Sequence, residues 1–320
     1  MSPDSRDPKA TGSSRTRHVL VTVLKWGLVV LAVVFLAREI TQQWLSVRDT
    51  LVATPVWSVL LSLFLAAAAV AASGEQQRGL LLAMGYRLGI AEWFRVFFVA
   101  QLGKYVPGTA WAYVSQMELS RAKGIRRATS VAVMLLGAGM TVLTSFALGW
   151  VSIGEGTVTW LPTWLRAIAA GCGVACMVAV MVRARWVGAL LAKLPERFRV
   201  GRSDLDLASL PSLWGPSTWT VTASVLYGFH VLVLSLPSGG FSWSLTAQSV
   251  GGFATAWVVG FLAFVVPAGV GVREVVLAAF LTPSLGSGGA LAVVVVSRFV
   301  IIIAEALLMA SAPLLGERSK

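Results

Sequence analysis

Long runs of apolar residues dominate the chain and alternate with short polar segments. Six of these runs approach or exceed the length of about 20 apolar residues that a helix needs to cross a bilayer. They occupy residues 18–37, 51–73, 128–151, 164–184, 212–235 and 289–312. The pattern predicts an all-α integral membrane protein, a polytopic helical bundle with six full spans.

Two further apolar stretches do not fit simple crossings. Residues 92–118 contain an apolar piece of about ten residues, which is too short to cross, and basic segments flank it on both sides. Residues 246–283 lie between loops without Lys or Arg. Each stretch has Pro and Gly near its centre, in LGKYVPG and in VPAGVG, where a helix should break. We expect two re-entrant helical hairpins, although two short crossings over 246–283 would give the same topology.

The order of elements repeats along the chain. Residues 18–151 and 164–312 each contain two spans, a hairpin and a span, so the two halves cross three times and have opposite orientations. Pro107 lies 21 residues before position 128, and Pro267 lies 22 before position 289. This layout is typical of an inverted-repeat transporter. It predicts one transmembrane domain over 18–312, between a disordered basic tail at 1–17 and a short tail at 313–320.

Composition supports the membrane assignment and excludes other classes. Of 320 residues, 57% are hydrophobic and 12% are charged, and the mean hydropathy is +0.79. A soluble globule of this length has too little interior to bury so much apolar surface. A cytosolic enzyme and a nucleic-acid-binding module are therefore excluded. The net charge of +12 is expected instead from Lys and Arg in cytoplasmic loops.

The basic residues also predict the orientation. Seventeen lie before the first, third and fifth spans or after the second and sixth, whereas the opposite loops contain only Arg38 and Arg48. Cytoplasmic loops of membrane proteins carry the excess of Lys and Arg. We therefore expect a multi-pass protein with both termini cytoplasmic.

A few charged residues fall within the membrane segments and suggest a binding site. An Arg at mid-membrane costs roughly 2.5–3.5 kcal/mol on the insertion scale, so such residues usually face the interior and serve a site. Half-helices that begin near the two breaks would point free N–H groups and positive dipole ends at the midplane. We expect an anion site in which cations bind a phosphate, carboxylates hold the cations or receive an amine, glycines permit close approach and Gln101 lines the cavity. The candidate residues are Lys104, Arg273, Arg298, Glu274, Glu305, Gly108, Gly269, Gly271 and Gln101, with Gln116 as a second possible cavity residue. A purely structural ion-pair network among Arg273, Glu274, Arg298 and Glu305, with Glu274 as counter-charge of Arg273, is the open alternative.

Catalytic chemistry has little support in the sequence. The predicted spans contain no Asp, and the chain has no HExxH or Walker motif. Cys172 and Cys176 are expected to be small buried hydrophobes, and His230 a core histidine with its hydrogen bonds satisfied. We therefore expect no enzyme activity, metal or cofactor.

The two break motifs are similar to the paired signatures of a known family. The segment Gln101–Gly108, QLGKYVPG, followed by Trp111, and the segment Pro267–Glu274, PAGVGVRE, resemble those of the lysylphosphatidylglycerol synthase transmembrane family, also called flippase-like. The resemblance covers about 20–312. It is to the membrane half of multiple-peptide-resistance factors, and we expect a stand-alone member without their soluble synthase domain.

The resemblance implies lipid flipping. We expect a translocase of the bacterial plasma (inner) membrane that moves a phosphate-bearing lipid, either a phospholipid or a polyprenyl-phosphate-type lipid, between leaflets. A membrane scaffold for a glycosyltransferase or lipid-modifying enzyme and a secondary transporter of a small anion are the alternatives. A homodimer and a separately encoded partner enzyme are possible partners, whereas a nucleic acid is not.

Overall fold

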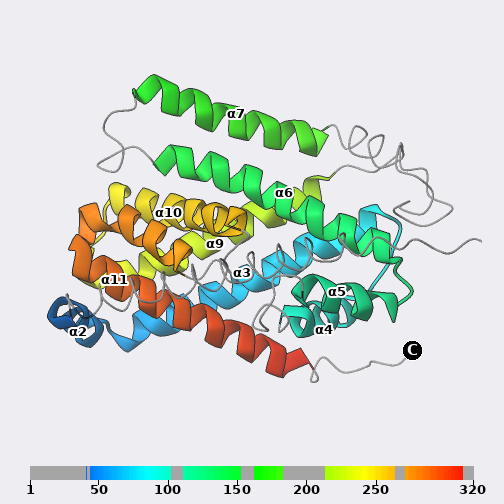
Figure 1. Cartoon of the computed structure of the whole chain (residues 1–320), viewed down its shortest axis with the longest axis horizontal. Helices are drawn as coiled ribbons and strands as arrows, with labels where there is room; N and C mark the ends of the chain where they lie inside the picture. Colours follow the sequence, from blue (N-terminus) through cyan, green and yellow to red (C-terminus); the bar gives the residue numbers. More distant parts are fainter. Residues whose placement is uncertain are drawn as a thin grey trace, which may run out of the picture.

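The computed structural model describes residues 41, 44–101, 111–152, 162–182, 213–263 and 271–312. These residues form helices and short connections, with no strand among them. The helices are α2 (Trp44–Ala53), α3 (Val56–Ala83), α4 (Ile90–Gln101), α5 (Trp111–Arg121), α6 (Arg127–Ser152), α7 (Thr163–Val182), α9 (Trp214–Gly239), α10 (Trp243–Leu262) and α11 (Val272–Ser311). Within the described ranges, five helices are long and apolar enough to cross a membrane: α3, α6, α9, α10 and α11. The chain is therefore a multi-pass helical membrane protein (Figure 1).

Two long helices, α3 and α9, form the centre of the bundle and run in opposite directions. Near one end, the Ser58 hydroxyl of α3 donates a hydrogen bond of 2.6 Å to the Val233 carbonyl of α9. Near the other end, Gly79 lies against Pro216, and a Cβ added at the glycine would lie 3.0 Å from the proline ring. The remaining helices pack around this antiparallel pair (Figure 1).

Helices α4 and α5 form a hairpin whose two ends meet. Glu92 in the first turn of α4 forms an ion pair of 2.9 Å with Lys123, which lies just beyond α5. Close by, the Arg126 N–H donates a hydrogen bond of 3.5 Å to the Tyr86 hydroxyl. The hairpin therefore begins and ends at the end of the bundle where α3 finishes. Its helices, 12 and 11 residues long, extend only about 16–18 Å.

A second hairpin consists of α10 and the first part of α11. Gly252 lies against Phe280, and Gly260 lies against Arg273, so the two segments are antiparallel. The chain turns sharply at Gly286, where φ is 69°, a backbone angle that favours glycine. Leu285, just before this turn, contacts Gly239 at the end of α9. This hairpin therefore begins and ends at the end of the bundle opposite to the first hairpin (Figure 1).

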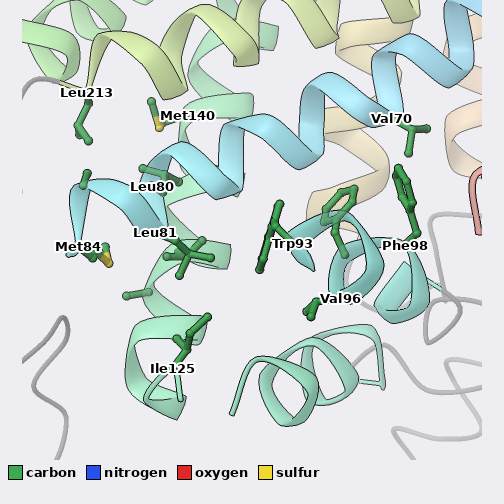
Figure 2. Close-up of a cluster of buried hydrophobic side chains, with 14 of the residues drawn as sticks. Val70, Leu80, Leu81, Met84, Trp93, Val96, Phe98, Ile125, Met140 and Leu213 are labelled. Atoms are coloured by element: carbon green, nitrogen blue, oxygen red, sulfur yellow. The ribbon is translucent and has the colours of Figure 1, made fainter. Parts of the chain in front are cut away.

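Beyond Gly286, α11 runs alongside α3 in the same direction. Val296 packs near Val59, and Val300 and Ala304 pack around Ala66. Toward the C-terminus, residues 308–312 join the largest buried cluster. This cluster fills the space between the end of α3 and the first hairpin, where Trp93 and Phe98 of α4 point toward α3 (Figure 2).

The structure confirms the helical class and corrects several boundaries. Residues 51–73 do not form one element, because Pro55 separates α2 from α3, and α3 continues to Ala83. Helix α9 extends past 235 to Gly239 and contains Pro237. Helix α6 matches the expected span 128–151 to within one residue. Helix α7 matches the bounds of the expected span 164–184 to within two residues but is not among the five helices named above for the described ranges, whereas α10, which was expected in a hairpin, is. The expected span 18–37 lies outside the described residues.

Candidate functional site

Arg273 lies at the first turn of α11 and crosses the surface of α10. Its aliphatic stem runs over Gly260 so closely that a Cβ there would lie 2.3 Å from Cγ and 2.6 Å from Nε. Its guanidinium carbon lies 5.8 Å from the ring centroid of Trp257, within range of a cation–π contact. Trp257 in turn stacks on Phe261, with ring centroids 5.2 Å apart. The contacts with Gly260 and Trp257 therefore fix the position of the guanidinium on α10.

One hydrogen-bond donor of Arg273 lacks an acceptor among the described residues. Its Nε atom is buried and has no hydrogen-bond partner among the described residues. A buried donor without an acceptor costs roughly 1–3 kcal/mol, and more when the group is charged. The same donor forms a strong hydrogen bond when an anion supplies the acceptor. The arrangement is one that a bound phosphate or carboxylate would complete.

Glu274 is used mainly by its own helix. Its Oε2 accepts a hydrogen bond of 2.6 Å from the Gly271 N–H, and Gly271 takes a positive φ of 85° as the residue before α11. Its Oε1 lies 3.7 Å from Nε of Arg298. The expected half-helix therefore starts at Val272, and one of its predicted free N–H groups is already bound.

The predicted ion-pair network is confirmed only in part. Within the described part of the chain, Glu274 pairs with Arg298, which joins the start of α11 to its later turns, and forms no ion pair with Arg273. The expectation that Glu274 is the direct counter-charge of Arg273 is therefore wrong. Among the described residues, the charged groups that act on Arg273 are Arg298, Glu274 and Glu305. Glu305 is buried, whereas the Arg298 side chain is 28% exposed and can reach a ligand.

Tyr113, in the first turn of α5, approaches this cluster from the first hairpin. Tyr113 is 42% exposed, and the positive charge of Arg273 acts on its hydroxyl. Tyr113 was not among the predicted site residues. Its position six residues after Pro107, like that of Arg273 after Pro267, is the signal that could have identified it.

Other expected site residues have different positions. Lys104, Gly108 and Gly269 lie outside the described residues. Gln101 is the last residue of α4 and is partly exposed. Gln116 is buried, and its side-chain amide donates to Gln77 of α3, so it joins two helices.

A polar segment of α3 was also missed, because residues 74–83 were assigned to a loop. Arg78 forms an ion pair of 2.8 Å with Glu75, and Gln76 donates to the Gly137 carbonyl at 3.0 Å. The indole N–H of Trp93 donates to the Gly74 carbonyl at 2.7 Å. These contacts provide partners for the polar groups of the segment and connect α3 to α4 and α6.

The remaining special residues have structural positions. His230 is fully buried between the Tyr227 carbonyl and the Ser297 hydroxyl, the latter 2.8 Å from Nε2, which confirms it as a core histidine with its hydrogen bonds satisfied.

Cys172 is exposed, so its expected burial is wrong. Its helix lies at the edge of the bundle (Figure 1). Among the described residues, no group of three or more His, Cys, Asp or Glu could hold a metal.

Comparison with protein families identifies the chain. The family described as the lysylphosphatidylglycerol synthase TM region matches residues 19–308. The chain belongs to the lysylphosphatidylglycerol synthase transmembrane family. No curated protein matches it. The match to this family covers both hairpins and the Arg273 cluster, and it relates this membrane protein to the handling of lipids.

Proposed function

We propose that this member of the lysylphosphatidylglycerol synthase transmembrane family is a translocase that moves a phosphate-bearing lipid between the leaflets of the bacterial plasma membrane. The observation that carries the proposal is the buried Nε of Arg273 at the first turn of α11, for which the described residues provide no hydrogen-bond partner. A cation with an unused donor inside a membrane domain is expensive unless a ligand or function uses it.

The charge balance of the site supports an anionic ligand. Arg273 and Arg298 lie on the same helix, and one carboxylate oxygen of Glu274 accepts a hydrogen bond from the Gly271 N–H. The contact between Glu274 and Arg298 is long, at 3.7 Å, and involves only one of the five N–H donors of the Arg298 guanidinium. A phosphate oxygen between the two arginines would satisfy both, and a planar guanidinium matches phosphate geometry with two parallel hydrogen bonds.

The arrangement of the two hairpins supports movement across the bilayer. In the proposed topology, six spans form an inverted repeat with both termini cytoplasmic, and the α4–α5 and α10–α11 hairpins enter from opposite faces. In transporters with inverted repeats, the binding site lies near the midplane where the broken helices of the two halves meet. Tyr113 and Arg273 lie in the first turns of α5 and α11, and the charge of Arg273 acts on the Tyr113 hydroxyl. A head group bound there would face either side of the membrane in turn.

A leaflet assay tests the proposal directly. The purified protein is reconstituted with a fluorescent phosphatidylglycerol, a polyprenyl phosphate or phosphatidylcholine, and the label in the outer leaflet is quenched with dithionite. We expect faster loss of the protected fraction for an anionic lipid than for phosphatidylcholine, with Arg273→Ala as the inactive control. If no lipid moves faster than in protein-free vesicles, the translocase proposal is wrong and the scaffold alternative gains support.

A further inference from the structure

Gly260 lies under the stem of Arg273, so close that a side chain at this position would require the arginine to move. A Cβ at this position would lie 2.3 Å from Cγ, 2.6 Å from Nε and 3.0 Å from Cδ of Arg273. Real Cβ atoms almost never approach other heavy atoms so closely, so an alanine would displace the arginine side chain. The absence of a side chain at Gly260 allows Arg273 to lie flat on α10.

The hairpin itself does not require a glycine here. Gly260 lies seven residues before Pro267, and Ala100 lies seven residues before Pro107 in the first hairpin. Ala100 is buried, with 2% of its surface exposed, in a helix of the same kind. The first hairpin therefore accommodates a Cβ at the equivalent position, and its counterpart of Arg273 is Tyr113. The glycine is needed for the arginine rather than for the turn.

The guanidinium group of Arg273 also contacts α10. The guanidinium of Arg273 lies over the ring of Trp257, one turn before Gly260 on α10, at 5.8 Å, and Phe261 stacks on Trp257. Stem and head therefore both contact α10, while Nε has no hydrogen-bond partner in the part of the chain that the structure describes. A donor held in this way binds an anion without first losing rotamer freedom, which is the usual benefit of preorganisation.

We infer that Gly260 is a positioning residue: together with Trp257 it fixes the Arg273 guanidinium on α10 in the orientation that binds the anionic head group. This inference rests on the proposed function for its second half only. That Gly260 holds Arg273 in place is a statement about the free protein. That the fixed orientation serves head-group binding requires the translocase activity.

The contact is tested by a thermal double-mutant cycle, which needs no substrate. The thermal midpoints of detergent-solubilised wild type, Gly260→Ala, Arg273→Ala and the double variant are compared. We expect Gly260→Ala to lower the midpoint by several degrees in the wild-type background and to have little effect with Arg273→Ala, because the shortened side chain leaves room for the methyl group. An equal loss in both backgrounds would overturn the inference.

The functional half is tested by the lipid dependence of transport. Translocation of fluorescent phosphatidylglycerol is measured at increasing mole fractions in proteoliposomes, per molecule of folded protein. A misplaced donor weakens binding, so we expect Gly260→Ala to raise the half-saturating mole fraction about tenfold, which corresponds to one misaligned strong hydrogen bond. An unchanged half-saturating mole fraction would refute the positioning role.

A matched control separates positioning from packing. Gly252, two turns earlier on α10, faces Phe280 of α11, and a Cβ there would lie 2.7 Å from the Phe280 Cβ. Gly252→Ala should therefore lower the thermal midpoint in either Arg273 background and leave the half-saturating mole fraction unchanged. If Gly252→Ala shifts lipid dependence as strongly as Gly260→Ala, general loosening of the hairpin explains both and the inference is wrong. If the wild type moves no phosphatidylglycerol, the proposed function fails, and the thermal cycle still decides whether Gly260 holds Arg273.

Discussion

Tyr113 and Arg273 occupy equivalent positions in the two hairpins and lie close enough for the charge of Arg273 to act on the Tyr113 hydroxyl. Each is six residues after a proline, Pro107 in the first hairpin and Pro267 in the second. Residues related by a two-fold axis come together only close to that axis. In the inverted repeat that we propose, the pseudo-symmetry axis would therefore pass between the first turns of α5 and α11.

This relationship predicts a specific cross-link. In a background with Cys172 and Cys176 replaced by alanine, the pair Tyr113→Cys and Arg273→Cys should be joined by a short bismaleimide. The product is detected after cleavage at a protease site inserted between residues 183 and 212, since linked halves stay together on a denaturing gel. Tyr113→Cys combined with Thr246→Cys, at the far end of α10, should not cross-link. Equal yields for both pairs would contradict the proposed axis.

Arg273→Lys should separate charge from geometry. Lysine keeps the positive charge but loses the planar fork that forms two parallel hydrogen bonds to a phosphate. We expect normal abundance and a rate of phosphatidylglycerol translocation reduced roughly tenfold or more, as loss of a charge-assisted hydrogen bond implies. Arg273→Ala should also fold, because Glu274 keeps Gly271 and Arg298 as partners, and should be inactive. Full activity of the lysine variant at normal abundance would remove Arg273 from head-group binding.

Glu274 should contribute to stability through the start of α11. Glu274→Ala removes the acceptor for the Gly271 N–H and the partner of Arg298, and we expect a loss of about 1–2 kcal/mol, as for other helix caps. Glu274→Gln keeps an acceptor oxygen and loses only the charge, so its cost should be about 0.5–1 kcal/mol. Unfolding of the detergent-solubilised protein followed by circular dichroism measures both. A larger loss for glutamine than for alanine would contradict the capping role.

Ser297 should matter for stability and not for transport. The His230 Nδ1 donates to a carbonyl, so its Nε2 accepts from the Ser297 hydroxyl, and Ser297→Ala leaves this buried nitrogen without a donor. We expect a loss of about 1–3 kcal/mol with unchanged translocation per folded molecule. Ser235→Ala is the control: the buried Ser235 hydroxyl bonds only the Val231 carbonyl of its own helix, and its removal should stay within about 0.5 kcal/mol.

The orientation predicted by the basic residues can be tested with reporter fusions. A reporter after Lys320 should be active in the cytoplasm, and one inserted between residues 152 and 163 should be active outside, because seventeen basic residues favour this arrangement and two oppose it. Alkaline phosphatase and green fluorescent protein give opposite signals at each position. Phosphatase activity from the C-terminal fusion would refute the six-span topology.

The sequence predicts the fold well where hydropathy alone decides, and less well where contacts between helices decide. Residues 128–151 are apolar throughout, and α6 follows them closely. Residues 74–78 are polar and would be a loop in isolation, yet they stay helical because the first hairpin and α6 provide their partners, Gln116, Trp93 and Gly137. Such partners come from more than 15 residues away and cannot be deduced from a local pattern.

The same limit applies to the site. The membrane position of Arg273 and Arg298 follows from their place in apolar runs. The capping bond from Gly271 to Glu274 follows from a turn whose positive φ the sequence does not specify. Gly260 and Trp257 belong to an uncharged helix without a distinguishing local pattern, and only the fold shows that Arg273 lies across them.

The hydrogen bond between Trp93 and Gly74 is a reference point for estimating how deep the residues of α4 lie in the bilayer. The apolar part of α3 from Val56 to Ser73 is about 27 Å long, close to the thickness of the hydrocarbon layer, so Gly74 and the indole bound to it mark the water boundary. Phe98 packs near Val70, one turn inside that boundary (Figure 2). In the proposed re-entrant topology, Gln101, eight residues beyond Trp93, would lie about 12 Å inside, close to the midplane at about 15 Å. A helix of 12 residues would thus place a primary amide at the centre of the membrane, where only protein, water or a passing head group can hydrogen-bond it.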